Sequence, residues 1–213
     1  MSKLKTRILL VDDHAVVRAG FKLLLAATSA IEVCGEADCG EKAIALYPTL
    51  QPDIVVMDLS MPGIGGLETI RRLIQRNENA KILVFSVYNE PIYVNRALIS
   101  GAQGYITKNS VPDILPEAIT HILEGHRYIE AGLLKNNAEQ DYPALIADFS
   151  AREFDIFHLL AKGLSIHEIA NDLCLSHKTV ANYANQINKK LQVSTSAELI
   201  RVALQLDTDR PPV

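Results

Sequence analysis

The sequence predicts two domains: an α/β domain built on a doubly wound, five-stranded parallel sheet, and an all-α domain of four short helices. In the N-terminal part, short apolar runs alternate with amphipathic stretches, whereas no strand pattern remains after Phe149. At 213 residues, of which 48% are hydrophobic and 22% charged, the chain is long enough for each domain to bury its own core.

The apolar runs of the first part predict its strands. The runs at 54–57 and 82–85 are continuously apolar rather than alternating, which suits strands covered by helices on both faces of a parallel sheet. Five strand–helix units of this length make a doubly wound sheet. The predicted strands are 7–11, 31–36, 54–57, 82–85 and 104–106, and the predicted helices lie near 15–27, 41–48, 66–77, 90–100 and 112–124.

Helix-start signals define the second domain. The segments 150–153, 165–168 and 195–198 each match a capping box, in which a hydroxyl and a glutamate satisfy backbone N–H groups at the first turn. Ser176 is a good N-cap, and Gly163 suits the residue that follows a helix end. The predicted helices lie near 151–162, 166–173, 177–191 and 196–206.

These signals place the first domain at 6–125, a linker at 126–148 and the second domain at 149–206. Residues 129–148 hold one lysine against four acidic residues, a net charge of 1 − 4 = −3. We interpret this stretch as an acidic linker, and we expect its charge to help hold an inactive state against a basic helix of the second domain.

Composition narrows the class of protein. A net charge of −4 argues against a chain that coats nucleic acid or membranes indiscriminately. Cys34, Cys39 and Cys174 lack the spacing of a zinc site or a redox dithiol, so we expect reduced core thiols. The apolar run near the N-terminus stops at Asp12 and Asp13, too early for a signal peptide or a membrane span, and we expect a cytoplasmic protein.

Polar residues follow four predicted strands, namely Asp12 and Asp13, Asp58, Ser86, and Lys108. The carboxyl ends of parallel strands converge on one crevice, where crowded carboxylates need a cation. Hard oxygen ligands in a partly open site favour Mg²⁺. A carboxylate there can attack a phosphoryl group and form an aspartyl-phosphate, whose oxygens would take hydrogen bonds from the lysine and the serine.

Simpler interpretations exist for each residue alone. Acidic pairs after a strand also occur because helix N-termini favour negative charge, and a lysine after a strand is usually solvated. The functional interpretation depends on the combination at four strand ends. We interpret His14 as a helix N-terminal residue on the rim rather than as a metal ligand. The acidic pair lacks the spacing of aspartate-nucleophile phosphatases and an acid/base partner, so we predict no enzyme active site.

The segment 168–180 reads as a helix, a short turn at about 174–176 and a second helix, the spacing of a helix-turn-helix. Apolar residues at helical spacing are predicted core: Ile169, Leu173, Val180, Ile187 and Leu191. Residues 177–191 hold three lysines and no acid, a charge of +3, which is typical of a DNA-reading helix. The predicted DNA contacts are His177, Lys178, Thr179, Ala181, Asn182, Asn185 and Lys189, and Lys190 is also expected to face outward.

Residues 7–125 resemble a two-component receiver domain, on the motifs LVDDH at 10–14, MDLSMPG at 57–63, FS at 85–86 and GAQGYITK at 101–108. Residues 149–206 resemble the LuxR-type helix-turn-helix of NarL/FixJ response regulators. That resemblance is carried by Glu153, Gly163, EIA at 168–170, SHKTV at 176–180 and KL at 190–191.

The receiver resemblance implies a flavodoxin-like fold and a role for each pocket residue. Asp58 would be the phosphoacceptor and, with Asp13, a Mg²⁺ ligand. Asp12 would act through metal-bound water, and the backbone carbonyl of Ser60 would complete the protein's share. Ser86 and Tyr105 would form a switch pair in which the tyrosine turns inward on phosphorylation. Tyr88 would flank the path of the hydrolytic water and shield the phosphoryl group.

Three positions depart from these families. Asn109 stands where many receivers have a cis proline, which affects the expected loop geometry. Ala181 and Tyr183 stand where a basic residue and a histidine are frequent, so the recognition helix has a reduced basic face. We therefore expect a shallower salt dependence of DNA binding, greater reliance on a dimer, and base readout by Asn182 and Asn185.

The sequence thus predicts a transcription regulator controlled by phosphorylation. A sensor histidine kinase or a small phosphodonor would phosphorylate Asp58, and a homodimer of the phosphorylated chain would bind duplex DNA, with no membrane partner. The alternative is a receiver whose helical output domain binds a protein instead of DNA, and the salt dependence of binding to duplex DNA separates the two.

Overall fold

The computed structural model describes residues 5–26, 30–110, 114–133, 146 and 148–208. The chain divides into two compact units, Met1–Asn136 and Asn137–Val213, and each is described by itself below. Most of the predicted linker lies outside the described residues, including two of its four acidic side chains.

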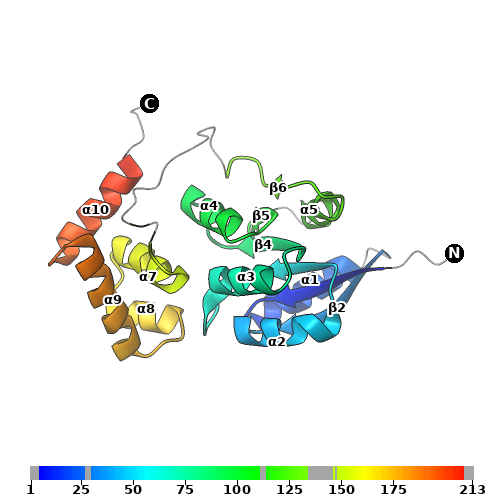
Figure 1. Cartoon of the computed structure of the whole chain (residues 1–213), viewed down its shortest axis with the longest axis horizontal. Coiled ribbons are helices and arrows are strands. Elements are labelled where there is room, and N and C mark those ends of the chain that lie inside the picture. The colour runs from blue at the N-terminus through cyan, green and yellow to red at the C-terminus, as the bar shows by residue number, and fades with distance from the viewer. Residues whose placement is uncertain (1–4, 27–29, 111–113, 134–145, 147, 209–213) are drawn as a thin grey trace. The chain divides into compact units, whose positions relative to one another are not determined.

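The first unit is a parallel sheet with strand order β2-β1-β3-β4-β5-β6, flanked by helices (Figure 1). Its strands are β1 (Thr6–Val11), β2 (Ile31–Ala37), β3 (Ile54–Met57), β4 (Ile82–Ser86), β5 (Gly104–Thr107) and β6 (Tyr128–Ile129). Its helices are α1 (Ala15–Ala26), α2 (Gly40–Leu50), α3 (Gly65–Arg76), α4 (Pro91–Ile99) and α5 (Ile114–Leu123). The predicted doubly wound, flavodoxin-like sheet is confirmed.

The continuously apolar runs are explained by burial on both faces of this sheet. Alternate residues of a strand point to opposite faces. Ile54 and Val56 belong to a core cluster that includes residues of α1 and α5, whereas their neighbours Val55 and Met57 are buried on the other face. A strand in the middle of such a sheet therefore has no exposed side for polar residues.

The sheet has six strands where five were expected. The additional strand, β6, is two residues long and pairs in parallel with β5, with Tyr128 opposite Gly104 and Ile129 opposite Tyr105. Two residues are too few to produce a periodic pattern, so the sequence offered no signal for this strand. Its formation depends on the free edge of β5, which only the folded sheet reveals.

The second unit is helical, with α7 (Ala151–Ala161), α8 (Ile166–Asp172), α9 (His177–Leu191) and α10 (Ser196–Thr208). All three predicted capping boxes are present, at Ser150, Ser165 and Thr195, each reciprocated by a glutamate three residues later. Gly163 follows α7 with a φ of +86°, the left-handed conformation that favours glycine after a helix. In the described part of the chain, no helix combines the length and apolar character needed to cross a membrane.

The three cysteines are free thiols, as expected, but they do not all lie in a core. Cys34 and Cys39 are half-buried in the first unit. Cys174 is exposed, because it occupies the turn between α8 and α9 with a left-handed φ of 50°. The expectation of core thiols is therefore wrong for Cys174.

Candidate functional site

The carboxyl ends of the strands bring the predicted pocket residues together. Lys108, after β5, places its Nζ 2.6 Å from Asp12 Oδ2 and 2.8 Å from Asp58 Oδ2. Both carboxylates are buried, with exposed fractions of 5% for Asp12 and 2% for Asp58. Residues that are far apart in the sequence, after β1, β3 and β5, thus meet at one buried ion cluster.

Backbone hydrogen bonds of the sheet hold these residues in place. The Asp58 N–H donates to the carbonyl of Val11 (2.8 Å), and the Lys108 N–H donates to the carbonyl of Ser86 (2.8 Å). Gly66, in the first turn of α3, lies so close that an added Cβ would stand 2.2 Å from the Asp58 carbonyl oxygen. The absence of a side chain at Gly66 lets α3 begin directly against the backbone of Asp58.

Burial and the lysine act in opposite directions on the pocket's ionisation. Burial raises the pKa of Asp58 to about 6, even though the neighbouring Lys108 acts to lower it. Burial also acts to lower the pKa of Lys108, but the charges of Asp58 and Asp12 outweigh it and the pKa is raised overall. The lysine therefore remains charged beside Asp58, which is the arrangement needed to attract an anionic group.

The same corner of the pocket has the donor set of a divalent-cation site. Asp12, Asp13, His14 and Asp58 each offer a ligand atom, and these atoms lie within 4.8 Å of one another. Asp13 Oδ1 is buried and accepts no hydrogen bond from any described residue, although His14 Nδ1 lies 2.8 Å from it. A buried carboxylate oxygen left without a hydrogen bond, among other hard oxygen donors, fits Mg²⁺.

Two further predicted residues lie close by. The Ser60 N–H donates to Asp58 Oδ1 at 3.3 Å, so the chain after β3 turns back over the carboxylate. His14 has a 62% exposed side chain, in agreement with a place on the rim, but its Nδ1 also lies 3.2 Å from Asp12 Oδ1. His14, interpreted as a rim residue rather than a metal ligand, thus also contacts both members of the acidic pair.

The predicted switch residues form one connected group between β4 and β5. Ser86 is fully buried, and its Oγ accepts from the Tyr88 N–H at 3.3 Å. Tyr105 is fully buried, and its hydroxyl donates to the Tyr88 carbonyl at 2.8 Å. Burial raises the pKa of Tyr105, so the hydroxyl keeps the proton it donates. The Tyr105 ring therefore occupies the inward position that the receiver resemblance associates with phosphorylation.

Tyr88 contacts α4. Its ring stacks on Tyr93, with the ring centroids 4.1 Å apart and the planes 5° from parallel. Shielding of a phosphoryl group by Tyr88 stays a prediction.

Sequence reasoning missed two charged residues that support the pocket. Arg18 of α1 donates from Nη1 to the Asp12 carbonyl at 2.6 Å, and its Nε lies 3.4 Å from Glu36 Oε2. Glu130, after β6, accepts hydrogen bonds from the loop that carries Lys108. Neither residue lies in a motif, and both act through contacts between distant elements that no local pattern reports.

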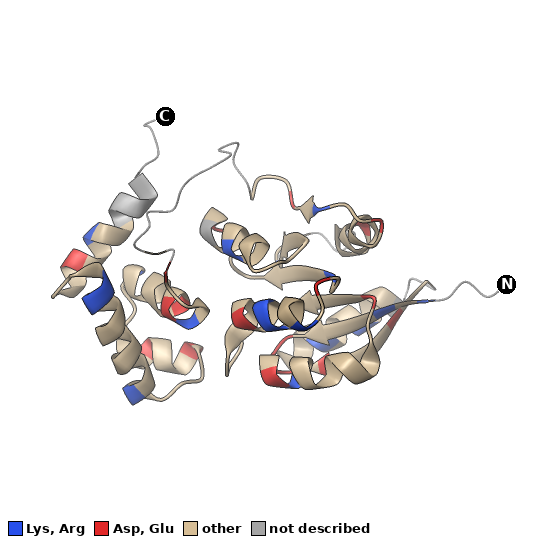
Figure 2. Ribbon diagram, viewed as in Figure 1, with Lys and Arg blue, Asp and Glu red and all other residues tan. Residues whose placement is uncertain are grey.

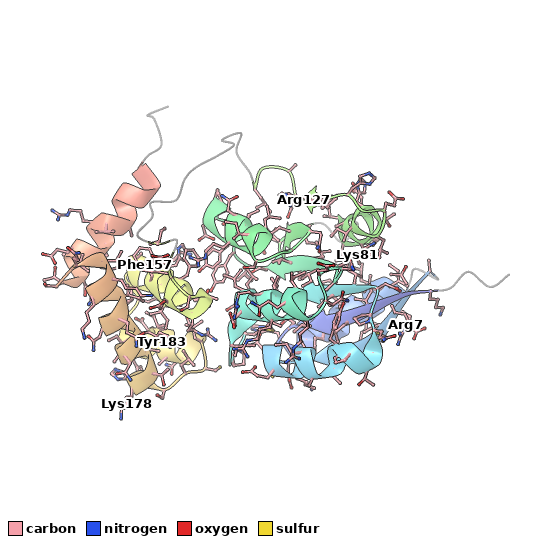
Figure 3. The ribbon with its side chains drawn as sticks, in the orientation of Figure 1. Arg7, Lys81, Arg127, Phe157, Lys178 and Tyr183 are labelled. Atoms are coloured by element: carbon pink, nitrogen blue, oxygen red, sulfur yellow. The ribbon has the colours of Figure 1, made fainter. Side chains whose placement is uncertain are left out.

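The second unit presents α9 as its basic surface. Figure 2 shows lysines and no acidic residue along this helix. Lys178 projects outward near its start (Figure 3). The predicted core residues Ile169, Leu173, Val180, Ile187 and Leu191 are all buried. Of the predicted DNA contacts, five are exposed and two are half-buried: His177, Lys178, Asn182, Asn185 and Lys189, and then Thr179 and Ala181.

Two polar groups of α9 are engaged within the unit. Thr179 Oγ1 lies 2.7 Å from the hydroxyl of the N-cap Ser176, so this threonine helps to start the helix. Lys190 Nζ lies 2.7 Å from the buried carboxylate of Glu153 in α7 and 5.5 Å from the centroid of the Phe149 ring. The expectation that Lys190 simply faces outward was therefore incomplete, because this lysine also joins two helices.

Comparison with known families agrees with both halves of this description. Residues 8–120 match the family "Response regulator receiver domain", and residues 147–203 match "Bacterial regulatory proteins, luxR family". The chain belongs to the NarL/FixJ response regulators. It is a two-component response regulator with a receiver domain and a LuxR-type helix-turn-helix DNA-binding domain.

Relatives of similar length support this membership. The "Transcriptional activator protein ExaE" of Pseudomonas putida is 40% identical over 204 residues, covering 93% of this chain and 95% of the relative. The "Response regulator UvrY" of Escherichia coli K12 is 36% identical over 203 residues, covering 93% of each chain. Among solved structures, that of "two RcsB dimers bound to two parallel DNAs" has 26% identity and a TM-score of 0.59, covering 92% of this chain and 96% of that one.

Proposed function

We propose that Asp58 of this response regulator accepts a phosphoryl group from a sensor histidine kinase or a small phosphodonor, and that this step controls sequence-specific binding of DNA and transcription. The observation that carries the proposal is the contact of one lysine, Lys108, with both Asp12 and Asp58 in the buried pocket. We place the receiver at 6–125 and the DNA-binding domain at 149–206, in a cytoplasmic regulator; of the segment 126–148 between them, predicted as a linker, β6 (Tyr128–Ile129) also belongs to the receiver's sheet.

The pocket residues divide the chemistry of phosphoryl transfer among them. A Mg²⁺ ion held by Asp13, Asp58, the Ser60 carbonyl and, through water, Asp12 would neutralise charge on the phosphoryl oxygens. Asp58 supplies the carboxylate oxygen that would form a bond to phosphorus, while the bond from phosphorus to the donor's nitrogen or oxygen breaks and the donor leaves with that electron pair. Lys108 Nζ, now paired with Asp58, is placed to move onto the phosphoryl oxygens.

The hydrogen-bonded side chains around Tyr105 suggest how phosphorylation would change the conformation of the receiver. On phosphorylation the buried Ser86 hydroxyl would bind a phosphoryl oxygen, and the inward Tyr105 ring would be favoured in the space beside it. The bond from the Tyr105 hydroxyl to the Tyr88 carbonyl supports an inward ring as one stable arrangement of this fold, which phosphorylation would then favour. The output of the switch would be a homodimer that binds DNA.

The α9 helix is the proposed reading element. Its exposed lysines would contact phosphates and set the register, and the amides of Asn182 and Asn185 would read base edges. A dimer would double this modest basic face, and the related structure of RcsB contains dimers on DNA. Support for the alternative, a protein-binding output domain, is limited to the reduced basic face at Ala181 and Tyr183.

The test combines phosphorylation with footprinting. The wild-type chain and the Asp58→Asn variant are incubated with acetyl phosphate and Mg²⁺, analysed by intact mass, and then footprinted on genomic DNA. We expect one added phosphoryl group and stronger, site-specific protection for the wild type only. Equal labelling of both chains would disprove the assignment of Asp58. Binding to duplex DNA that does not weaken with salt, or no binding at all, would favour the protein-binding alternative.

A further inference from the structure

The loop that carries Lys108 is held by a residue from outside the predicted pocket, Glu130. This glutamate directly follows β6, and its own N–H donates to the Tyr105 carbonyl at 3.0 Å. Because β6 pairs with β5 in register, the glutamate stands beside the end of the strand that leads into Lys108. It is also among the last described residues before the chain continues toward the DNA-binding unit.

The Glu130 carboxylate binds the loop on both sides of Lys108. Its Oε2 accepts from the Thr107 N–H at 2.7 Å and lies 2.6 Å from the Ser110 hydroxyl oxygen. Ser110 Oγ also lies 2.9 Å from Thr107 Oγ1, so a serine hydroxyl that donates to the carboxylate can accept from the threonine. One carboxylate oxygen thereby closes a ring of hydrogen bonds around the residues that flank the lysine.

The lysine itself is fixed at both of its ends. Its backbone N–H donates to the Ser86 carbonyl, and its Nζ contacts the two buried carboxylates of the pocket. The residue that follows it, Asn109, has no ring to restrict the backbone, unlike a proline. Within residues 107–110 the Ser110 N–H and hydroxyl also lie within hydrogen-bonding distance of the Thr107 carbonyl, at 3.2 and 2.7 Å, and Glu130 adds contacts that tie this turn to β6.

We propose that Glu130 is the positioning residue for Lys108, holding the β5–α5 loop so that the ammonium group lies at the phosphoacceptor carboxylate. The predicted acidic linker included Glu130 as a charge available to the recognition helix, but its carboxylate is engaged by the receiver loop instead. The inference rests on the proposed phosphorylation of Asp58. By this inference, a residue at the start of the segment between the two domains would position the lysine that acts in phosphoryl transfer.

The role requires hydrogen-bond geometry rather than charge alone. Charge-assisted hydrogen bonds are short and directional, and a misplacement of a catalytic group by about 1 Å can slow a reaction by about 100-fold. A glutamine at this position keeps an acceptor oxygen of the same reach and removes the charge. An alanine removes the acceptor, and Ser110→Ala removes one of its two donors while leaving the other intact.

The experiment measures the rate of phosphorylation of the full chain by acetyl phosphate at saturating Mg²⁺, as a function of phosphodonor concentration. We expect E130A to lower the maximal rate by about tenfold, with a smaller change in the half-saturating concentration, since the lysine acts on the reacting group. E130Q should restore most of that rate, and S110A should fall between. The matched control is E124Q, which makes the same charge change at a side chain that is 61% exposed.

Amide NMR of the Thr107 N–H supplies a readout that does not depend on the reaction, because its signal should move in E130A and stay near its wild-type position in E130Q. A maximal rate in E130A and S110A equal to that of the wild type would overturn the inference, as would an E130Q rate no higher than that of E130A. If the wild-type chain itself takes no phosphoryl group at Asp58, the proposed function fails. If the wild type is phosphorylated and the Glu130 variants match it, only the role of Glu130 fails.

Discussion

The acidic pocket around Asp58 and the outer face of α9 differ in what fixes the positions of their side chains. In the pocket, the ends of β1, β3 and β5 converge, so Asp12 and Asp58 are buried and the half-buried Lys108 contacts both of them. On α9, Lys178, Asn182 and Asn185 are exposed and share only the frame of one helix. The side chains of the first site are positioned by one another, whereas those of the second would be positioned by the DNA that it is proposed to bind.

The function of a buried charged residue can therefore be inferred more firmly from its neighbours than that of an exposed residue. A buried charge must have partners, so the identity of each pocket residue is constrained by its neighbours. An exposed residue on a helix has no such requirement, and its role depends on the shape and charge of the partner. Substitutions in the pocket should therefore have large effects on both chemistry and stability, and those at the exposed side chains of Lys178, Asn182 and Asn185 should affect binding alone.

The largest expected effect is on the pocket lysine. Lys108→Met keeps the length of the side chain and removes the charge, and we expect phosphorylation by acetyl phosphate to slow by about 100-fold or more, since a preorganised donor to the reacting oxygens is lost. The control is Lys42→Met on α2, where the lysine is half exposed and pairs with Asp38 on the surface. If both variants were phosphorylated at similar rates, Lys108 would have no special role in the pocket.

Asp58 should make the stability of the chain depend on pH. Its pKa is about 6 in the folded chain against an ordinary value of 3.8, so its ionisation opposes folding. The stability it contributes is present below about pH 4, falls as pH rises to about 6, and then stays constant, a change of about 3 kcal/mol.

The measurement is the difference in unfolding free energy between the wild type and Asp58→Asn in metal-free buffer. We expect the asparagine variant to gain on the wild type by about 2 kcal/mol from pH 4 to pH 7. Addition of Mg²⁺ should reduce the gap at pH 7, because the cation binds the ionised carboxylate. A difference that is independent of pH would contradict the effect of burial on Asp58.

On α9, two substitutions should distinguish side chains that contact DNA bases from side chains that contact DNA phosphates. Asn182→Ala should reduce discrimination between the preferred site and other DNA by about 1–3 kcal/mol. Lys178→Ala should weaken binding to all sequences alike and reduce the salt slope by about 1. Both effects are measured by titration of labelled duplexes at several salt concentrations. If Asn182→Ala leaves discrimination unchanged, the assignment of base readout to this residue is wrong.

The smallest expected effect distinguishes two adjacent lysines. Lys190→Ala should lower the free energy of unfolding of the DNA-binding unit by about 1 kcal/mol, because it leaves the buried Glu153 carboxylate without its cation. Lys189→Ala removes the same charge from an exposed side chain and should leave stability unchanged. Denaturant unfolding of both variants tests this, and equal losses would show that α9 lacks the internal contact described above.

The sequence predicted most of what depends on local pattern. Apolar runs such as 54–57 placed the strands, and residues at strand ends such as Asp58 predicted the pocket, because a parallel sheet brings those ends together. It did not predict β6 or the role of Glu130, which depend on the free edge of β5 and on a loop about 20 residues earlier. Contacts between distant polar side chains have no periodicity, so a single sequence does not reveal them.

Glu153 joins the start of α7 to the last turn of α9 through one side chain. Its carboxylate accepts from the Ser150 N–H at the start of α7 and pairs with Lys190 in the last turn of α9, and these contacts lower its pKa against the effect of burial. The first helix cannot fray at this end without releasing the last turn of the recognition helix. The four helices should therefore unfold cooperatively, and hydrogen exchange at the end of α9 should report the opening of α7 as a single event.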